Sequence, residues 1–206
     1  MLATDLLHLL DVPVVELARE AARIRDHAHG DRVTFSPKVF IPLTMLCRDR
    51  CGYCTFAKPP AHLDHPYLPL ETVLEIARQG AAMGCHEALF TLGEAPEARY
   101  PAAAEWLERH GYASTVDYLV AAAGAVLDET GLLPHANAGA LSLHDLARLR
   151  AVSPSQGMMI ETLAARLGGP GGPHAGAPDK TPERRLATLP VDEDFLLLRS
   201  ALWQRA

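Results

Sequence analysis

Short apolar runs of strand length alternate with segments of helical periodicity, and this alternation limits the chain to few folds. Residues 39–46 read VFIPLTML, a continuous apolar run that is typical of a strand buried on both faces. Further strands are expected at 86–92, 132–137 and 156–162. Buried strands that alternate with helices form parallel sheets through right-handed crossovers. The sequence therefore predicts an α/β fold with about four parallel strands, whose functional loops meet at the carboxyl ends of the strands.

The segments between the strands have the apolar spacing of amphipathic helices. Helices are expected at 70–83, 101–110, 114–130, 142–150 and, as a short run, 182–189. The glycine- and proline-rich stretch 168–173 separates the last of these from the fourth strand and is expected to be a loop. Residues 1–33 are expected to form lead-in helices that serve for packing, because apolar residues recur at helical spacing over 6–29.

Composition and charge exclude several classes of protein. With 49% hydrophobic and 21% charged residues, the chain has the balance of a globular protein. Its formal charge of −6 and its lack of clustered basic residues argue against a nucleic-acid partner. No run approaches the roughly 20 apolar residues of a membrane span, and acidic Asp5 and Asp11 replace a basic leader, so a cytoplasmic location is expected.

Three of the four cysteines follow the first predicted strand directly. The sequence CRDRCGYC places Cys47, Cys51 and Cys54 in a C-x3-C-x2-C spacing, which is a ligand cluster of a reducing compartment rather than a disulfide framework. Three thiolates on one short loop can hold three irons of a 4Fe-4S cluster and leave the fourth iron without a protein ligand. That iron is then open to a substrate or a cofactor.

Zinc is the main alternative at this loop, since thiolates also bind zinc well. A structural zinc site needs four ligands, and the fourth would have to come from Cys85 or a histidine. Cys85 precedes the second strand, so it is expected at the amino edge of the sheet, opposite to the loop cysteines. We interpret Cys85 as a small core residue and place the cluster ahead of a zinc-stabilised, non-catalytic module.

The cysteine spacing, the aromatic residue before the last cysteine and the βα repeat together resemble the radical S-adenosylmethionine (SAM) enzymes over about residues 39–162. The resemblance implies that Cys47, Cys51 and Cys54 hold a 4Fe-4S cluster whose open iron binds the amino and carboxylate groups of SAM. In such enzymes an electron from the cluster cleaves SAM to methionine and a 5'-deoxyadenosyl radical. A reductant protein is therefore implied as a partner.

A narrower resemblance, to the first of the two radical SAM modules of FO synthases, spans about residues 34–189. It is carried, in this order, by PLTMLCRDRCGYCTF, EALFTLGEAPEARYPAAAEWLERHGYASTVDY, ETGLLPHANAG, SQGMMIET and HAGAPDK. FO synthases make 7,8-didemethyl-8-hydroxy-5-deazariboflavin (FO), the chromophore of coenzyme F420. The resemblance implies a lyase that oxidises a tyrosine-derived adduct of 5-amino-6-(D-ribitylamino)uracil by hydrogen abstraction, with ring closure and loss of ammonia. Another radical SAM enzyme on the same scaffold is the alternative, because a fold does not fix a reaction.

The same resemblance implies cofactor contacts from residues that follow the strands. Tyr53 is expected near the adenine of SAM, with ordinary loop packing as its alternative. Gly93 and Glu94 are expected near the SAM amino group. Glu161, with Thr162 beside it, is expected to accept hydrogen bonds from the ribose.

Substrate contacts are expected from four further residues, three of which have a structural alternative. His135 and Asn137 end the third strand, and His135 could instead be a partly buried histidine with satisfied hydrogen bonds. Asp179 and Lys180 lie in the loop beyond the fourth strand and could instead form an ion pair with each other, which is weak if exposed. Glu94, and Glu97, which carries no assigned role, could instead be helix-start carboxylates.

Some of the chain departs from the family's pattern. Ala138 and Ala177 stand where proline and serine are expected, and the resemblance stops near residue 189. We therefore expect three parts: lead-in helices at 1–33, a radical SAM domain at 34–189, and a tail at 190–206. Four strands are fewer than a closed barrel needs, so the domain is expected to be a partial barrel that lacks its C-terminal strands. Little FO formation is expected from such a chain alone, and a second radical SAM module, fused or separate, is implied as a partner.

Overall fold

The computed structural model describes residues 8–189, which belong to two units, 1–35 and 36–206, and each unit is described by itself. The first contains helix α1 (Val14–His29), which follows Pro13 and ends at Gly30, a residue with a φ of 61°. Taken alone, α1 buries none of its residues. The packing role of the lead-in segment stays a prediction, and the expected tail at 190–206 lies outside the described residues.

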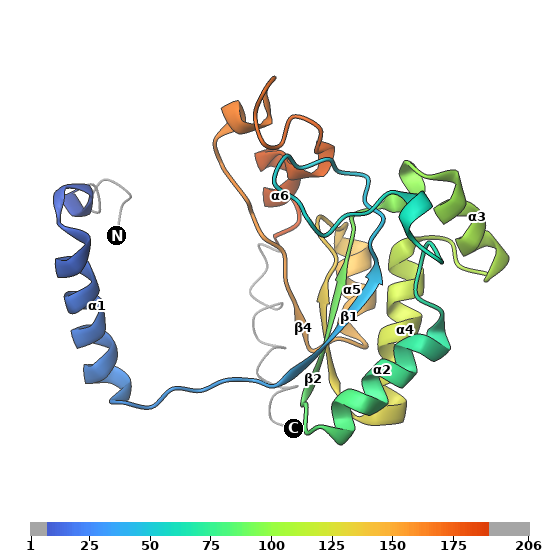
Figure 1. Cartoon of the computed structure of the whole chain (residues 1–206), viewed down its shortest axis with the longest axis horizontal. Helices are drawn as coiled ribbons and strands as arrows, with labels where there is room; N and C mark the ends of the chain where they lie inside the picture. Colours follow the sequence, from blue (N-terminus) through green and yellow to red (C-terminus); the bar gives the residue numbers. More distant parts are fainter. Residues whose placement is uncertain (1–7, 190–206) are drawn as a thin grey trace. The chain divides into compact units, whose positions relative to one another are not determined.

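One sheet of four parallel strands organises the second unit, as the sequence predicts. The strands follow the order of the chain, β1-β2-β3-β4. Their bounds are β1 (Lys38–Thr44), β2 (Glu87–Leu92), β3 (Leu133–Asn137) and β4 (Ser155–Gln156). The helices between and after them are α2 (Leu70–Ala82), α3 (Pro101–Arg109), α4 (Thr115–Thr130), α5 (Leu143–Arg150) and α6 (Pro182–Leu186). Figure 1 shows α2, α4 and α5 along the sheet and α6 beyond the carboxyl ends of the strands.

Helix α4 illustrates why these segments fold as they do. The Ser114 side chain accepts a hydrogen bond from the Asp117 amide and so caps the helix start. Gly131, with a φ of 71°, ends the helix in the left-handed conformation that glycine adopts at little cost. Between them, apolar residues at helical spacing, including Leu119 and Val126, are fully buried against the sheet and α2.

The fourth strand is shorter than predicted, which corrects its expected span of 156–162. Pairing with β3 is limited to Ser155 and Gln156, followed by one hydrogen bond from the Gly157 amide to the Ala136 carbonyl at 2.9 Å. Within the described residues β4 is an edge strand, so no second neighbour extends its ladder. Glu161 has a φ of 67°, and this left-handed residue turns the chain away from an extended course.

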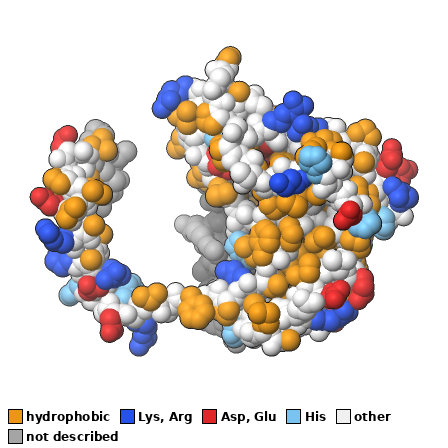
Figure 2. Space-filling model, in the orientation of Figure 1, with side chains coloured by type: hydrophobic (Ala, Val, Ile, Leu, Met, Phe, Trp, Pro, Cys, Tyr) orange, Lys and Arg blue, Asp and Glu red, His pale blue; other side chains and the backbone are white. Residues whose placement is uncertain are grey.

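The other edge of the sheet carries apolar surface. Phe40 on β1 is 50% exposed and packs edge-on against Phe56. Figure 2 shows hydrophobic side chains gathered on this face of the unit, in the region of β1 and α2. None of the described helices is long and apolar enough to cross a membrane.

Candidate functional site

A cavity of about 210 Å³ lies at the carboxyl ends of the strands, between the loops that follow them. Of the twelve site residues that the sequence predicts, it is lined by Cys47, Cys51, Cys54, Tyr53, Gly93, Glu94, Asn137, Glu161 and Lys180. These residues come from the loops after β1, β2 and β4, from the last residue of β3, and from the segment before α6. The parallel topology brings them together, because every strand delivers its loop to the same edge of the sheet.

The three loop cysteines are free thiols on the wall of this cavity. The Glu94 amide donates to Sγ of Cys47 at 3.2 Å, and the Ala57 amide donates to Sγ of Cys54 at 3.5 Å. Burial raises the pKa of the Cys47 thiol and raises that of Cys51 to about 11. Both residues therefore favour the neutral thiol until a cation compensates the thiolate charge, and amide donors to sulfur are the contacts that tune iron–sulfur clusters.

The spacing of the thiols bears on the zinc alternative. Around one zinc ion, thiolate sulfurs converge on bonds of about 2.3 Å, which places them within about 4 Å of one another. Among residues 8–189, the trio of candidate ligands whose atoms all lie within 4.8 Å of one another is Asp49, Glu94 and Asp179. Cys85 lies just before β2, at the amino edge of the sheet, as predicted, and so does not supply a fourth thiol at this loop. Three thiols that line one cavity without a fourth thiol beside them fit a cluster with one open iron better than a zinc site of four thiolates.

Gly93 allows the turn after β2 to approach the cysteine loop. A Cβ atom at this position would lie 1.8 Å from the Leu46 carbonyl oxygen and 2.7 Å from Cβ of Cys47, so a side chain is excluded. Ala95, two residues later, has a φ of 37°. The second left-handed non-glycine residue, Glu161, lines the cavity itself, and such backbone strain is common at functional sites.

Tyr53, Glu161 and Lys180 form one hydrogen-bonded chain across the cavity mouth. The Tyr53 hydroxyl donates to Oε2 of Glu161 at 2.9 Å, and Nζ of Lys180 donates to Oε1. Burial alone would raise the pKa of Glu161, but the hydrogen bonds from Lys180 and Tyr53 hold this pKa below its ordinary value. Desolvation and the neighbouring carboxylate raise the pKa of Tyr53. Tyr53 also meets the His174 ring edge-on at 5.4 Å between centroids.

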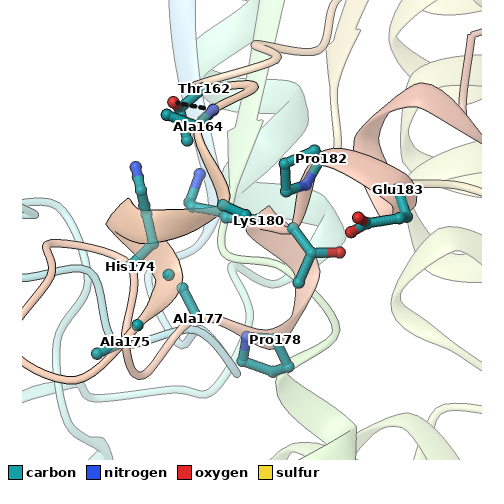
Figure 3. Close-up of a pocket in the computed structure, with 13 residues that line it drawn as sticks. Thr162, Ala164, His174, Ala175, Ala177, Pro178, Lys180, Pro182 and Glu183 are labelled. Carbon is teal, nitrogen blue, oxygen red and sulfur yellow. Dashed lines mark hydrogen bonds between the residues drawn. The ribbon is translucent and has the colours of Figure 1, made fainter.

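Three predicted site residues lie outside this cavity. Thr162 lines a second cavity of about 400 Å³, shared with Lys180, in which the side chains of His174 and Lys180 both point toward the turn at Thr162 (Figure 3). His135 hydrogen bonds through Nδ1 to the Ser155 hydroxyl, which agrees with its structural alternative. Asp179 is buried in an ionic cluster, described next.

The ionic cluster was not predicted. Asp49, Glu94 and Asp179 gather their carboxylates, Arg185 donates to Glu94 at 2.7 Å, and Arg48 donates to Asp179 at 2.5 Å. Burial raises the pKa of Glu94 to about 7 and raises that of Asp49. Arg185 thus pairs with Glu94 and Arg48 with Asp179, so two of the three carboxylates have a guanidinium partner, while Asp49 accepts a hydrogen bond from the Asp179 amide. The sequence offers one faint signal, an aspartate between two arginines inside the thiol loop.

Two of the structural alternatives are resolved by the contacts. Asp179 and Lys180 do not pair with each other, since Asp179 contacts Arg48 and Lys180 contacts Glu161. The alternative of a loop ion pair between them is therefore wrong. Glu97 is a helix-start carboxylate, as its alternative states: it accepts hydrogen bonds from the Thr115 amide at 3.0 Å and the Thr115 hydroxyl at 2.6 Å, where α4 begins.

Curated relatives match most of the chain, whereas no protein-family profile matches it. The chain is 52% identical to the FO synthase of Streptomyces avermitilis over 184 residues, which cover 84% of this chain and 21% of that protein. It is 48% identical to the 7,8-didemethyl-8-hydroxy-5-deazariboflavin synthase of Methanopyrus kandleri, covering 76% of this chain and 47% of that protein. The chain thus spans about a fifth of the first relative and about half of the second.

Solved structures agree with the predicted fold. Methylornithine synthase (PylB) superimposes with a TM-score of 0.62 at 20% identity, covering 96% of this chain and 52% of that one. The FeFe-hydrogenase maturase HydG of Carboxydothermus hydrogenoformans gives a TM-score of 0.62 at 19% identity, covering 87% and 36%. At such identities the likeness concerns the fold alone, and it confirms the predicted α/β fold of four parallel strands, which matches one part of these longer chains. By its sequence identity over most of its own length, the chain is a homologue of the FO synthases and corresponds to one part of them.

Proposed function

We propose that this chain acts in the synthesis of FO as a radical SAM lyase, with Cys47, Cys51 and Cys54 as the three ligands of a 4Fe-4S cluster. One observation carries the proposal: the three thiols share a cavity with Tyr53 and Glu161 in a chain that is about half identical to FO synthases. The donor set supports iron–sulfur binding because three thiols line one cavity and two of them accept amide hydrogen bonds.

In this proposal the chain's own residues bind and orient SAM. The Gly93–Glu94 turn borders its amino end, and Tyr53 lies beside the adenine. Glu161, with Thr162 behind it, receives the ribose hydroxyls, a role that its ionised carboxylate suits because hydrogen bonds to a charged acceptor are the stronger ones. When bound, the cluster and SAM supply a 5'-deoxyadenosyl radical that abstracts hydrogen from the substrate.

The proposed substrate is the tyrosine-derived adduct of 5-amino-6-(D-ribitylamino)uracil, which closes its ring and loses ammonia. Asn137 and Lys180 line the cavity and are the proposed direct contacts. His135 and Asp179 are already engaged by Ser155 and Arg48, so we propose that they support the neighbouring loops. A reductant protein and a second radical SAM module, fused or separate, complete the proposed reaction.

Anaerobic reconstitution with iron and sulfide tests the proposal. The expected result is a 4Fe-4S spectrum and release of 5'-deoxyadenosine from SAM when a reductant is added. Formation of FO, measured by mass spectrometry with the substrates and a competent second module, then tests the lyase assignment. Tight binding of one zinc ion with no iron–sulfur cluster would contradict the proposal, and SAM cleavage without FO would favour another radical SAM reaction.

A further inference from the structure

Both carboxylate oxygens of Glu94 are already engaged by the protein. Oε1 accepts a hydrogen bond from the Ala140 amide at 2.5 Å, and Oε2 accepts one from the Arg185 guanidinium at 2.7 Å. The side chains of Arg185 and Glu94 are only 2% and 9% exposed. The carboxylate also fills the space above Gly139, where a Cβ atom would lie 2.5 Å from Cδ of Glu94. These contacts hold the carboxylate tightly and leave it little freedom to bind a ligand.

The main chain of Glu94 faces the cysteine loop. Its amide donates to Sγ of Cys47 at 3.2 Å, and its carbonyl accepts from the Arg48 amide at 2.8 Å. The same residue therefore links the candidate cluster loop, through its backbone, to helix α6, through its side chain and Arg185. Displacement of the Glu94 side chain would move the donor to the Cys47 sulfur.

A second set of contacts joins the cysteine loop to residues 173–179, which precede α6. The Asp179 amide donates to Oδ1 of Asp49 at 3.1 Å, while the Arg50 amide donates to the Gly176 carbonyl at 2.7 Å and the Gly52 amide to the Pro173 carbonyl at 2.8 Å. Every second residue from 48 to 52 is thus anchored by a main-chain hydrogen bond. The cysteine loop has no regular secondary structure of its own beyond an isolated bridge, so its shape depends on these neighbours.

We propose that Glu94 and Arg185 are positioning residues, a buried pair that fixes the turn after β2 and, through it, the Cys47 thiol, without the Glu94 carboxylate contacting the cofactor. The inference rests on the proposed function only in taking Cys47 as a cluster ligand. Arg185 suits this task because a buried guanidinium can bridge segments that are distant in the chain, and removal of one partner leaves the other charge buried and unpaired.

Thiol reactivity in the apoprotein tests the proposal without any cofactor. Cys47 and Cys85 are both half-buried and lie at opposite edges of the sheet, so the ratio of their alkylation rates, read by mass spectrometry, separates local loosening from general unfolding. Arg185→Met should raise the rate at Cys47 roughly tenfold and leave Cys85 unchanged. Arg166→Met, at an exposed arginine of the preceding segment, is the matched control and should change neither rate.

Two further variants keep the test decisive. Arg185→Lys retains the charge and should give an intermediate ratio, and it replaces Arg185→Met in the comparison if the latter does not fold. The double variant Glu94→Gln/Arg185→Met should loosen Cys47 less than the two single effects combined, because the unpaired charge is gone. An unchanged ratio of Cys47 to Cys85 reactivity, or an equal rise at both cysteines, would overturn the positioning role. Failure of the wild-type protein to take up iron and sulfide would instead contradict the proposed function. The ratio of the alkylation rates of Cys47 and Cys85 would still test whether Glu94 and Arg185 position the Cys47 thiol.

Discussion

The helix-covered face of the sheet and its carboxyl edge are built on opposite principles. On the covered face, buried residues such as Leu119 and Phe90 are apolar, and the buried Tyr67 hydroxyl is paired with Thr115 at 2.7 Å. At the carboxyl edge, charged side chains are buried, and one oxygen each of Asp49 and Asp179 has no hydrogen-bond partner among the described residues. Such costs are retained where geometry matters more than stability, so the covered face stabilises the fold, whereas the carboxyl edge has the buried charges that are typical of functional sites.

Loss of a loop cysteine should give the largest effect and concerns the edge alone. Alanine at Cys47, Cys51 or Cys54 should abolish the 4Fe-4S cluster, because each supplies one of three thiolates and the cavity offers no fourth. Iron and sulfide per chain, with electron paramagnetic resonance after reduction, measure the effect. The control is Cys85→Ala at the opposite edge, which should reconstitute as the wild type does. A cluster that survives in any of the three loop variants would show that the ligand set is misassigned.

A core truncation should produce the next largest effect and concerns the covered face. Leu119→Ala should lower the free energy of unfolding by about 2–5 kcal/mol, because it leaves a cavity at a fully buried position. Leu143→Ala, at a leucine that is 64% exposed, is the matched control and should change stability by less than about 0.5 kcal/mol. Urea titration measures both.

Loss of the iron–sulfur cluster in Leu119→Ala would contradict the separation of the helix-covered face from the carboxyl edge. Below its unfolding transition, Leu119→Ala should still take up iron and sulfide in the wild-type ratio, because the residue lies on the face and not at the edge. A folded Leu119→Ala protein without a cluster would show that the two regions are not separable.

The two regions also differ in how far the sequence predicts them. A continuous apolar run identifies β1, and the alternation of short strand-like segments with helical periodicity identifies β2 and β3. The cavity residues follow from the rule that parallel strands deliver their loops to one edge. The Glu94–Arg185 pair joins residues 91 positions apart, and Arg185 in PERRL reads as an ordinary basic residue near a helix end. The end of β4 escapes prediction for another reason: GMMI is apolar enough for a strand, whereas the left-handed turn at Glu161 leaves no compositional signal.

A smaller effect is expected from the chain of hydrogen bonds at the cavity mouth. Glu161→Gln should weaken SAM binding roughly tenfold, because a neutral amide replaces a charged acceptor that Lys180 and Tyr53 hold in place. Equilibrium binding of SAM to the reconstituted protein measures the effect. Glu105→Gln, at an exposed glutamate of α3, serves as the control. Equal SAM affinity of Glu161→Gln and the wild type would remove Glu161 from the binding site while leaving the cysteine assignment intact.

The smallest effect concerns Asp117, which accepts a hydrogen bond from the Ala113 amide at 3.0 Å and forms an ion pair with Arg148. The amide first, and then Arg148, hold the pKa of Asp117 below its ordinary value of 3.8. A carboxylate whose pKa is lower in the folded than in the unfolded protein stabilises the fold above the unfolded value, and this contribution is lost as the pH falls through the folded value. Asp117→Asn should therefore cost about 0.5–1 kcal/mol of unfolding free energy at pH 7, and the difference from wild type should shrink below about pH 4. Asp128→Asn, at an exposed aspartate of the same helix, is the matched control and should change the free energy of unfolding at pH 7 by less than about 0.5 kcal/mol. Urea titrations of both variants from pH 7 to pH 3 measure these differences in the free energy of unfolding. If the loss of unfolding free energy in Asp117→Asn stayed constant over this range, the ionised Asp117 carboxylate would not be what stabilises the helix-covered face.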